Sequence, residues 1–197
     1  MVDAIVLAAG AGSRLRTLGD KPLLIIEGKS FLQRSVDNIS ESGIEKIVIV
    51  VSERLQGKLT DGITQKAVIA VNNDPSRGML SSILTGAKYL DEQNSALVFP
   101  VDHPLVQRNT VSELLLYAQR DASAIIVPTY LGRRGHPTIF PSWSLDMLAE
   151  HNPSDGARWI LHQFPDKVVE MPTNDEGVVI DIDTPENYRK YIIQRQG

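Results

Sequence analysis

Three cations follow a run of small residues near the start of the chain, and this combination is suited to binding a polyphosphate. The run Ala9–Ser13 reads AGAGS, and Arg14, Arg16 and Lys21 lie within the next eight residues. Small side chains allow backbone N–H groups to approach phosphate oxygens closely, while the cations balance the phosphate charge. The segment therefore predicts a nucleoside triphosphate site.

Two other nucleotide-binding motifs fit this part of the chain poorly. A dinucleotide fingerprint that began at Gly10 and Gly12 would need a third glycine at position 15, which is Leu15. A P-loop that ended at Gly28–Ser30 would need an earlier glycine at position 23, which is Leu23. The remaining alternative is an ordinary surface turn with solvated charges.

Carboxylates occur at two later points where strands are expected to end. Asp102 follows the apolar run Ser95–Val101, and α/β sheets bind ligands at the carboxyl ends of their strands. Beside a triphosphate, one or two carboxylates are typical protein ligands of Mg²⁺. The run Val178–Asp183 is predicted to be a strand, and its alternation would place Asp181 and Asp183 on one face. The alternatives are a turn-forming Asp102 and an Asp183 that assists the helix cap at Thr184.

Three further segments carry groups that could contact a ligand. A turn-rich stretch ends at Gly78, and a helix is predicted from about Leu80, so Ser81 lies near its start, where it could bind a ligand or simply cap the helix. The segment 132–140 packs two arginines and His136 into one loop, which is either an anion-facing loop with a titratable donor or a solvated basic hairpin. Arg158 follows Asp155, the predicted N-cap of another helix, and could reach a phosphate or remain an exposed cation.

The elements that must position these groups alternate between strand-like and helix-like patterns, as in an α/β sheet. Ser30 and Gln33 have the spacing of a capping box, and Gly43 is a plausible end of the helix that they open. The predicted strands are Ala4–Ala8, Lys46–Val51, Ala67–Val71, Ser95–Val101 and Ser123–Val127, and the predicted helices include Phe31–Ser42 and Thr110–Arg120.

Length and composition exclude several classes of protein. The 197 residues fit one domain with a sizeable core, and 42% hydrophobic and 22% charged residues are ordinary for a globular protein. A net charge of −4 argues against a general nucleic-acid binder, and the absence of cysteine excludes disulfides and thiolate chemistry. With no apolar run of about 20 residues and no signal peptide expected, we predict a cytoplasmic protein without a membrane span.

Six motifs of the chain can be compared with known families: LAAGAGSRL followed by DKP, GM-x-SS with a later glycine, DHP, RGHPTIF, GAR and DIDTPENY. Together they resemble the molybdenum cofactor nucleotidyltransferase family, whose members include molybdopterin cytidylyltransferase-like, or MobA-like, NTP transferases. RGHPTIF is the most discriminating of the six motifs, because sugar-nucleotide enzymes are not expected to carry it. The resemblance covers the chain from 1 to 197 and implies a single Rossmann-like domain, a three-layer α/β/α sandwich around a mostly parallel sheet of the nucleotide-diphospho-sugar transferase type.

The resemblance also implies a reaction, in which an NMP is transferred from an NTP to a phosphorylated acceptor, molybdopterin in this family, and pyrophosphate is released. Mg²⁺ is the implied cofactor, held by Asp102 and by Asp183 in preference to Asp181. Arg14 and Lys21 are the implied catalytic cations. The implied nucleotide-binding residues are Leu7, Ala8, Ala9, Gly10, Gly12, Gly78, Met79 and Ser81, and the implied acceptor-binding residues are Arg134, Gly135, His136 and Arg158.

One departure from the family pattern leaves the acceptor open. Arg16 follows Leu15, where the molybdenum-cofactor branch usually has glycine, and G-S-R-L-R is more similar to sugar-1-phosphate or choline-phosphate nucleotidyltransferases. The run LAAG at residues 7–10, in place of LAGG, resembles the cytidylyl-type members of the family, and this resemblance favours CTP over GTP as the nucleotide. A glycosyltransferase that uses Asp181 and Asp183, and a nucleotide sensor without catalysis, are further alternatives. The expected partners are these small molecules, without nucleic acid or membrane, and a transient contact with a product-accepting molybdoenzyme or chaperone.

Overall fold

Strand β1 (Val2–Ala8) lies inside the sheet and carries the chain directly into the small-residue loop. The computed structural model describes residues 1–10, 12–15, 17–75 and 78–194, so Arg16 lies outside the described residues. β1 pairs in parallel with β4 (Ile47–Val51) and with β6 (Ser95–Pro100). Its side chains alternate between two apolar clusters, since Ala4 and Val6 belong to one and Ile5 and Leu7 to the other. Both faces of β1 are therefore buried, as its unbroken apolar sequence predicts.

The main sheet is mixed but mostly parallel, which confirms the predicted fold class. Its strand order is β10-β7-β9-β6-β1-β4-β5, and β8 pairs with β7 outside this path. The antiparallel pairs all involve β8 or β9, the short strands on either side of the RGHP segment. The remaining strands are β5 (Val68–Val71), β7 (Ile125–Tyr130), β8 (Arg133–Arg134), β9 (Thr138–Phe140) and β10 (Val168–Pro172), and β2 (Ile25–Ile26) and β3 (Lys29–Ser30) form a separate hairpin.

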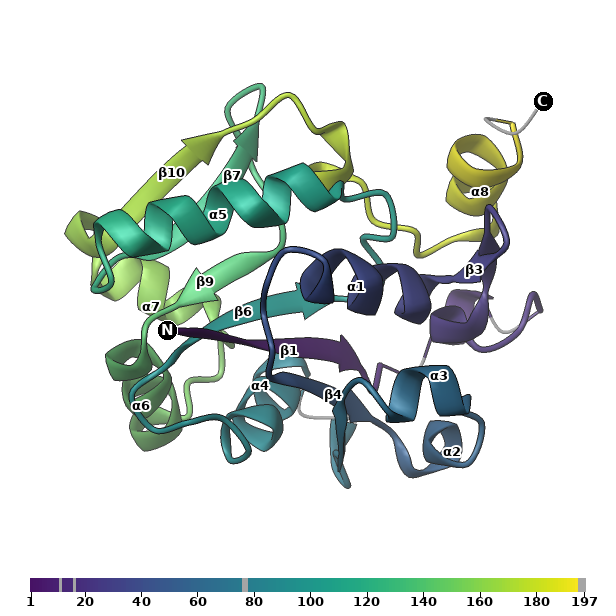
Figure 1. Cartoon of the computed structure of the whole chain (residues 1–197), viewed down its shortest axis with the longest axis horizontal. Coiled ribbons are helices and arrows are strands. Elements are labelled where there is room, and N and C mark those ends of the chain that lie inside the picture. The colour runs from purple at the N-terminus through teal and green to yellow at the C-terminus, as the bar shows by residue number, and fades with distance from the viewer. Residues whose placement is uncertain (11, 16, 76–77, 195–197) are drawn as a thin grey trace.

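Helices cover both faces of the sheet and complete three layers (Figure 1). On one face lie α1 (Phe31–Ser40) and α5 (Arg108–Arg120). On the other lie α4 (Met79–Ala87), α6 (Ser142–His151) and α7 (Arg158–Gln163). Short helices α2 (Glu53–Gln56), α3 (Asp61–Thr64) and α8 (Pro185–Tyr188) lie around the carboxyl edge of the sheet. None of the described helices has the length and apolar character needed to cross a membrane.

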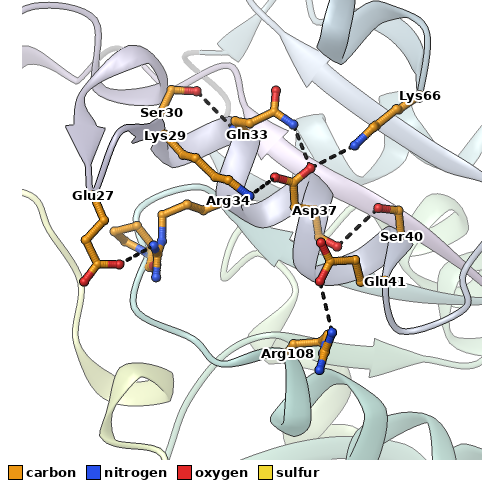
Figure 2. Close-up of polar contacts among 11 residues, drawn as sticks. Glu27, Lys29, Ser30, Gln33, Arg34, Asp37, Ser40, Glu41, Lys66 and Arg108 are labelled. Atoms are coloured by element: carbon orange, nitrogen blue, oxygen red, sulfur yellow. Dashed lines mark hydrogen bonds and ion pairs between the residues drawn. The ribbon is translucent and has the colours of Figure 1, made fainter.

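Helix α1 begins where the capping spacing predicts, because Ser30 Oγ accepts a hydrogen bond of 3.1 Å from the backbone N–H of Gln33. The Gln33 side chain does not return to the cap but donates to Asp37, which also pairs with Lys29 and Lys66 (Figure 2). Burial acts to raise the pKa of Asp37, but the hydrogen bonds from the two lysines outweigh it and the pKa is lowered. Asp37 thus joins the helix to the β2–β3 hairpin and to the segment before β5.

Two predictions about local structure are wrong. Val178–Asp183 is not a strand, because residues Glu176–Val179 form a 3₁₀ turn and the chain then runs on unpaired to α8. Asp155 does not cap a helix, because α7 begins at Arg158 and is preceded by Gly156 at φ 69°, which separates the aspartate from the helix. In both cases, turns built on glycine and tertiary contacts override the local pattern.

Candidate active site

Small residues at the end of β1 and just after it, Ala8, Gly10 and Gly12, line one part of a narrow cleft with few side-chain atoms. The side chains of Leu7 and Ala9 are buried in the apolar cluster beneath the loop, so only their backbone groups remain available to a ligand. Gly12 has φ 53°, a conformation that favours glycine, and a Cβ there would lie 3.4 Å from Lys21 Cβ. The cleft is lined by Ala8, Gly10, Gly12, Gly19, Asp20, Lys21, Pro22, Ser52, Arg54 and Leu55.

Lys21 joins the two carboxylates that the sequence places far apart. Its Nζ lies 3.3 Å from Asp102 Oδ2 and donates a hydrogen bond to Asp183 Oδ1. Asp102 follows β6 and Asp183 precedes α8, so the carboxyl edge of the sheet brings these groups together. Arg14 lies at the edge of this group, with Nη1 3.9 Å from Asp183 Oδ2 and its side chain largely exposed. The structure therefore brings Lys21, Asp102 and Asp183 into contact and places Arg14 beside them.

The charge balance at this group favours the charged form of Lys21. Burial acts to lower the pKa of Lys21, but the charge of Asp102 and the hydrogen bond to Asp183 outweigh it and the pKa is raised. The structure describes residues 1–10, 12–15, 17–75 and 78–194, and across them no group of three or more metal-binding side chains occurs. Asp102 Oδ1 is nevertheless buried and accepts no hydrogen bond from these residues. Two carboxylates with one orphaned oxygen fit Mg²⁺, which takes few protein ligands, better than Zn²⁺.

The two carboxylates of the DIDTPENY motif, Asp181 and Asp183, lie in different surroundings. Asp181 is exposed, and its backbone C=O accepts a hydrogen bond of 3.0 Å from Asn187. Asp183 is half-buried against Lys21. Thr184 caps α8 through a hydrogen bond of 3.1 Å from Asn187 N, so the helix does not need the Asp183 carboxylate as its cap. This geometry favours Asp183 over Asp181 as the second ligand.

A larger pocket of about 580 Å³ gathers the residues predicted to bind the acceptor. Arg134, Gly135, His136 and Arg158 all line it, together with Gly78 and Met79 from the start of α4. Its lining is largely apolar, and Arg134 and Arg158 add positive charge to it. The remaining lining residues are Leu80, Ile83, Val98, Val127, Thr138, Phe140, Ser154, Asp155, Gly156, Ala157, Leu161 and His162.

His136 is a neutral member of this pocket rather than the titratable donor that the loop sequence suggests. Burial, reinforced by the neighbouring His103 and Arg158 and opposed by Asp102, lowers the pKa of His136 to about 4. Its ring meets the ring of His103 edge to face, with centroids 5.0 Å apart, and its Nδ1 is buried without a hydrogen-bond partner among the described residues. At neutral pH this side chain can exchange a hydrogen bond with a ligand but carries no charge.

This lowered pKa predicts how stability changes with pH. Between pH 6.5 and 4 the unfolded chain binds a proton at His136 that the folded chain excludes, so stability falls as pH falls through this window, by up to about 3 kcal/mol. In His136→Asn, urea unfolding at pH 7 and pH 5 should show a smaller loss than in the wild type. Equal losses in the two proteins would contradict the assignment.

Gly135 allows the RGHP loop to touch the segment that leads to Asp183. A Cβ at this position would lie 2.1 Å from the carbonyl oxygen of Val178, and His136 N donates to that same oxygen at 2.8 Å. We expect Gly135→Ala to reduce the free energy of unfolding by about 1–3 kcal/mol, because backbone cannot yield as a flexible side chain can. Gly62→Ala in α3, where a Cβ meets open space, is the matched control and should lose nothing in the same urea titration.

Two predicted site residues, Arg134 and Ser81, make contacts that the sequence does not predict. Arg134 lines the pocket but pairs with Glu170 at 2.8 Å, and β8 forms a hairpin with β7. The basic hairpin is therefore present, and the anion-facing role of this loop stays a prediction. Ser81 donates to the backbone oxygens of Gly78 and Asp74, at 2.9 and 3.1 Å, and so secures the turn before α4 rather than lining the pocket. Its role in nucleotide binding stays a prediction.

The sequence of the chain matches that of a known family over most of its length. The model for the MobA-like NTP transferase domain matches residues 4–168, which span the small-residue loop, Asp102 and the RGHP segment. The chain belongs to the MobA-like NTP transferase family. It is thus an enzyme of the transferase kind by family, and the predicted resemblance is confirmed. The prediction that one such domain accounts for the whole of 1–197 stays a prediction.

Relatives in this family carry different activities. Over 192 residues the chain is 33% identical to the nicotine blue oxidoreductase of Paenarthrobacter nicotinovorans, which covers 94% of this chain and 93% of that protein. It is also 30% identical over 130 residues to the 2-C-methyl-D-erythritol 4-phosphate cytidylyltransferase of Alteromonas mediterranea. That match covers 65% of this chain and 54% of the cytidylyltransferase.

Solved structures share the fold of this MobA-like domain. The Rv0371c protein of Mycobacterium tuberculosis in complex with manganese superposes with a TM-score of 0.76 at 21% identity, covering 98% of this chain and 97% of that one. Molybdopterin-guanine dinucleotide biosynthesis protein A of Archaeoglobus fulgidus gives a TM-score of 0.72 at 16% identity, covering 100% and 99%. A divalent metal in a protein of this fold is consistent with the carboxylate pair.

Some residues of the MobA-like site were missed by sequence reasoning. His162 lines the large pocket one helical turn after Arg158, and this i, i+4 spacing could have revealed it. Arg54 and Lys58 both pair with Asp20, beside Lys21, and thereby hold the loop before Lys21 against the segment after β4. No local pattern announces that pairing, because the residues are more than thirty positions apart.

Proposed function

We propose that this protein transfers CMP from CTP to a phosphorylated acceptor, molybdopterin in the first instance, and releases pyrophosphate. The observation that carries the proposal is the contact of one half-buried lysine, Lys21, with two carboxylates from distant segments, Asp102 and Asp183. This group lies at the carboxyl edge of the sheet, beside the cleft at the small-residue loop, and that edge is where α/β sheets bind ligands.

In the proposed reaction, an oxygen of the acceptor phosphate attacks the α-phosphorus and the bond to the β-phosphate oxygen breaks. The second pKa of an acceptor phosphate lies near 6, so the nucleophile is already ionised at pH 7 and no strong general base is needed. Catalysis then consists of positioning and charge neutralisation. Lys21 and Arg14 stabilise the negative charge that moves onto the leaving pyrophosphate.

Asp102 and Asp183 are the residues that would hold Mg²⁺, and the orphaned Asp102 Oδ1 supports this assignment. A bound divalent ion supplies charge neutralisation to the phosphate oxygens. Lys21 contacts both carboxylates and so holds them close together. The nucleotide is assigned to the backbone of Leu7, Ala8, Ala9, Gly10 and Gly12 and to Gly78, Met79 and Ser81, of which Gly78 and Met79 also line the acceptor pocket.

The 580 Å³ pocket is assigned to the acceptor, with Arg134 and Arg158 toward its phosphate and Gly135 and His136 in the wall. CTP is preferred to GTP on the LAAG form of the loop, and the relationship to a cytidylyltransferase supports this choice. Sugar-1-phosphates and choline phosphate are the alternative acceptors.

A second candidate function is a redox reaction, because the relative that aligns over almost the whole chain is named an oxidoreductase. The largely apolar lining of the pocket and the neutral His136 suit a flat, uncharged ring system. Such a reaction would consume a reduced electron donor and release no pyrophosphate. It would also leave the contacts of Lys21 with two carboxylates without a chemical task.

The deciding experiment measures pyrophosphate release with each of the four nucleoside triphosphates and Mg²⁺, with and without molybdopterin, a set of sugar phosphates and choline phosphate. We expect release with CTP and only in the presence of an acceptor. A parallel assay follows oxidation of NADH and NADPH with quinone dyes. Electron transfer without pyrophosphate release from any triphosphate would replace the proposal with the redox candidate.

A further inference from the structure

The segment that carries Asp183 to the site has no strand pairing to hold it. Between β10 and α8 the chain forms the 3₁₀ turn Glu176–Val179 and then runs extended, so its position depends on tertiary contacts. The first of these contacts is made by Asp175, a carboxylate only 5% exposed. A buried carboxylate is costly unless hydrogen bonds satisfy it, so its partners show what it is for.

Asp175 links the Asp183 segment to the chain that follows Asp102. Its Oδ2 accepts hydrogen bonds from Gln107 N at 2.8 Å and from Thr110 Oγ1 at 2.7 Å, at the start of α5. Its Oδ1 accepts from Gly177 N at 2.9 Å, within its own segment. The carboxylate thus ties the loop after β6 and the approach to α8 through neutral donors, and it lies near the favourable end of the α5 dipole.

Three further contacts join the same two segments, the one before Asp183 and the one after Asp102, closer to the site. A Cβ on Gly177 would lie 2.5 Å from the carbonyl of Leu105, so the two backbones are in direct contact. His103 Nδ1 lies 3.4 Å from Gly177 O, and Ile182 N donates to Asp102 O at 2.8 Å. These contacts between the two segments begin at Asp175, a buried carboxylate that accepts three hydrogen bonds, and end at Ile182, one residue before Asp183.

We propose that Asp175 is a positioning residue that sets the spacing of the Asp102 and Asp183 carboxylates, and so the affinity of the site for a divalent ion. The inference rests on the proposed function, because it takes these two carboxylates as metal ligands. Asn at position 175 keeps the size of the side chain but has only one acceptor oxygen. Its NH₂ group would therefore face an N–H or O–H donor, and the hydrogen bonds on that side of the carboxylate would be lost.

The test compares Asp175→Asn with a control of the same kind at the other end of the sheet. Asp3 is also a buried aspartate, 4% exposed, and accepts hydrogen bonds from Asp91 N and Asn94 Nδ2. Mn²⁺ binding is measured by electron paramagnetic resonance with CTP present and acceptor absent, so that no turnover is needed. Urea unfolding of each variant records the loss of stability separately.

We expect the Mn²⁺ dissociation constant of Asp175→Asn to rise about 10- to 100-fold, the range found when groups that orient metal ligands are altered. Asp3→Asn should lose comparable stability but keep the wild-type constant. Thr110→Val, which removes one of the three hydrogen bonds, should shift the constant less in the same direction, and Thr110→Ser should restore it. These two variants keep the proposal testable where Asp175→Asn does not fold.

Each other outcome has a definite meaning. Equal Mn²⁺ affinity in the wild type, Asp175→Asn and Thr110→Val would overturn the positioning role and leave the proposed function standing. An equal loss of affinity in Asp3→Asn would also overturn it, because the effect would then follow stability alone. A wild-type protein that binds no Mn²⁺ with CTP would instead overturn the metal site of the proposed function.

Discussion

Asp102→Asn is expected to lower the rate of pyrophosphate release on the order of 10²- to 10³-fold. The change removes the charge but keeps the shape of a side chain whose Oδ2 meets Lys21 and whose Oδ1 has no other hydrogen-bond partner among the described residues. A loss of one preorganised electrostatic contact in the transition state typically has this size. Initial rates at saturating CTP and acceptor, across a Mg²⁺ series, provide the measurement.

The matched control is Asp181→Asn, which alters an exposed aspartate two residues from Asp183. It should retain nearly wild-type rates at every Mg²⁺ concentration. A rate in Asp102→Asn within a factor of two of the wild type would remove Asp102 from the metal site. A large loss in Asp181→Asn would reverse the choice between the two carboxylates of the DIDTPENY motif.

Lys21→Ala is expected to lower turnover about as much as Asp102→Asn does, but to increase the stabilisation of the protein by a divalent metal. Without the ammonium, Asp102 and Asp183 lose the cation that contacts both of them, and their negative charges repel each other. Pyrophosphate release should fall about 10²- to 10³-fold, because the leaving group loses its cation. In the absence of nucleotide, Mn²⁺ should raise the melting temperature of Lys21→Ala more than that of the wild type, because the ion relieves this repulsion.

Lys29→Ala is the control for this second prediction, since Lys29 pairs with Asp37 in the hairpin and α1 rather than at the site (Figure 2). Its turnover and its Mn²⁺ response should match those of the wild type. If Mn²⁺ stabilised Lys21→Ala no more than the wild type, the two carboxylates would not form a joint cation site.

Much of the fold could be predicted from the sequence because its central strands, β1, β4 and β6, are buried on both faces. An apolar run such as that of β1 has few alternatives, and the caps at Ser30 and Thr184 are local interactions that short spacing reveals. The carboxyl edge of a parallel sheet then brings Lys21 and Asp102 together, because that edge collects the loops after each strand.

The parts that could not be predicted depend on contacts between distant residues. The Val178–Asp183 segment alternates like a strand, yet Val178 lies in backbone contact with Gly135, and the preceding Gly177 lies in backbone contact with Leu105. Local periodicity cannot reveal either contact. The neutral state of His136 follows from its burial against His103, a partner from another loop. The buried Asp175 looks like an ordinary turn residue in the sequence, and only its partners in α5 show its importance.

The most direct test of the central claim is a crystal structure of the protein with Mn²⁺ and a non-hydrolysable CTP analogue, with the metal located by anomalous scattering. The proposed function predicts one Mn²⁺ coordinated by Asp102, Asp183 and an α-phosphate oxygen, with Lys21 and Arg14 on the triphosphate and the cytidine against the small-residue loop. A triphosphate bound elsewhere, or a metal that contacts neither carboxylate, would contradict it.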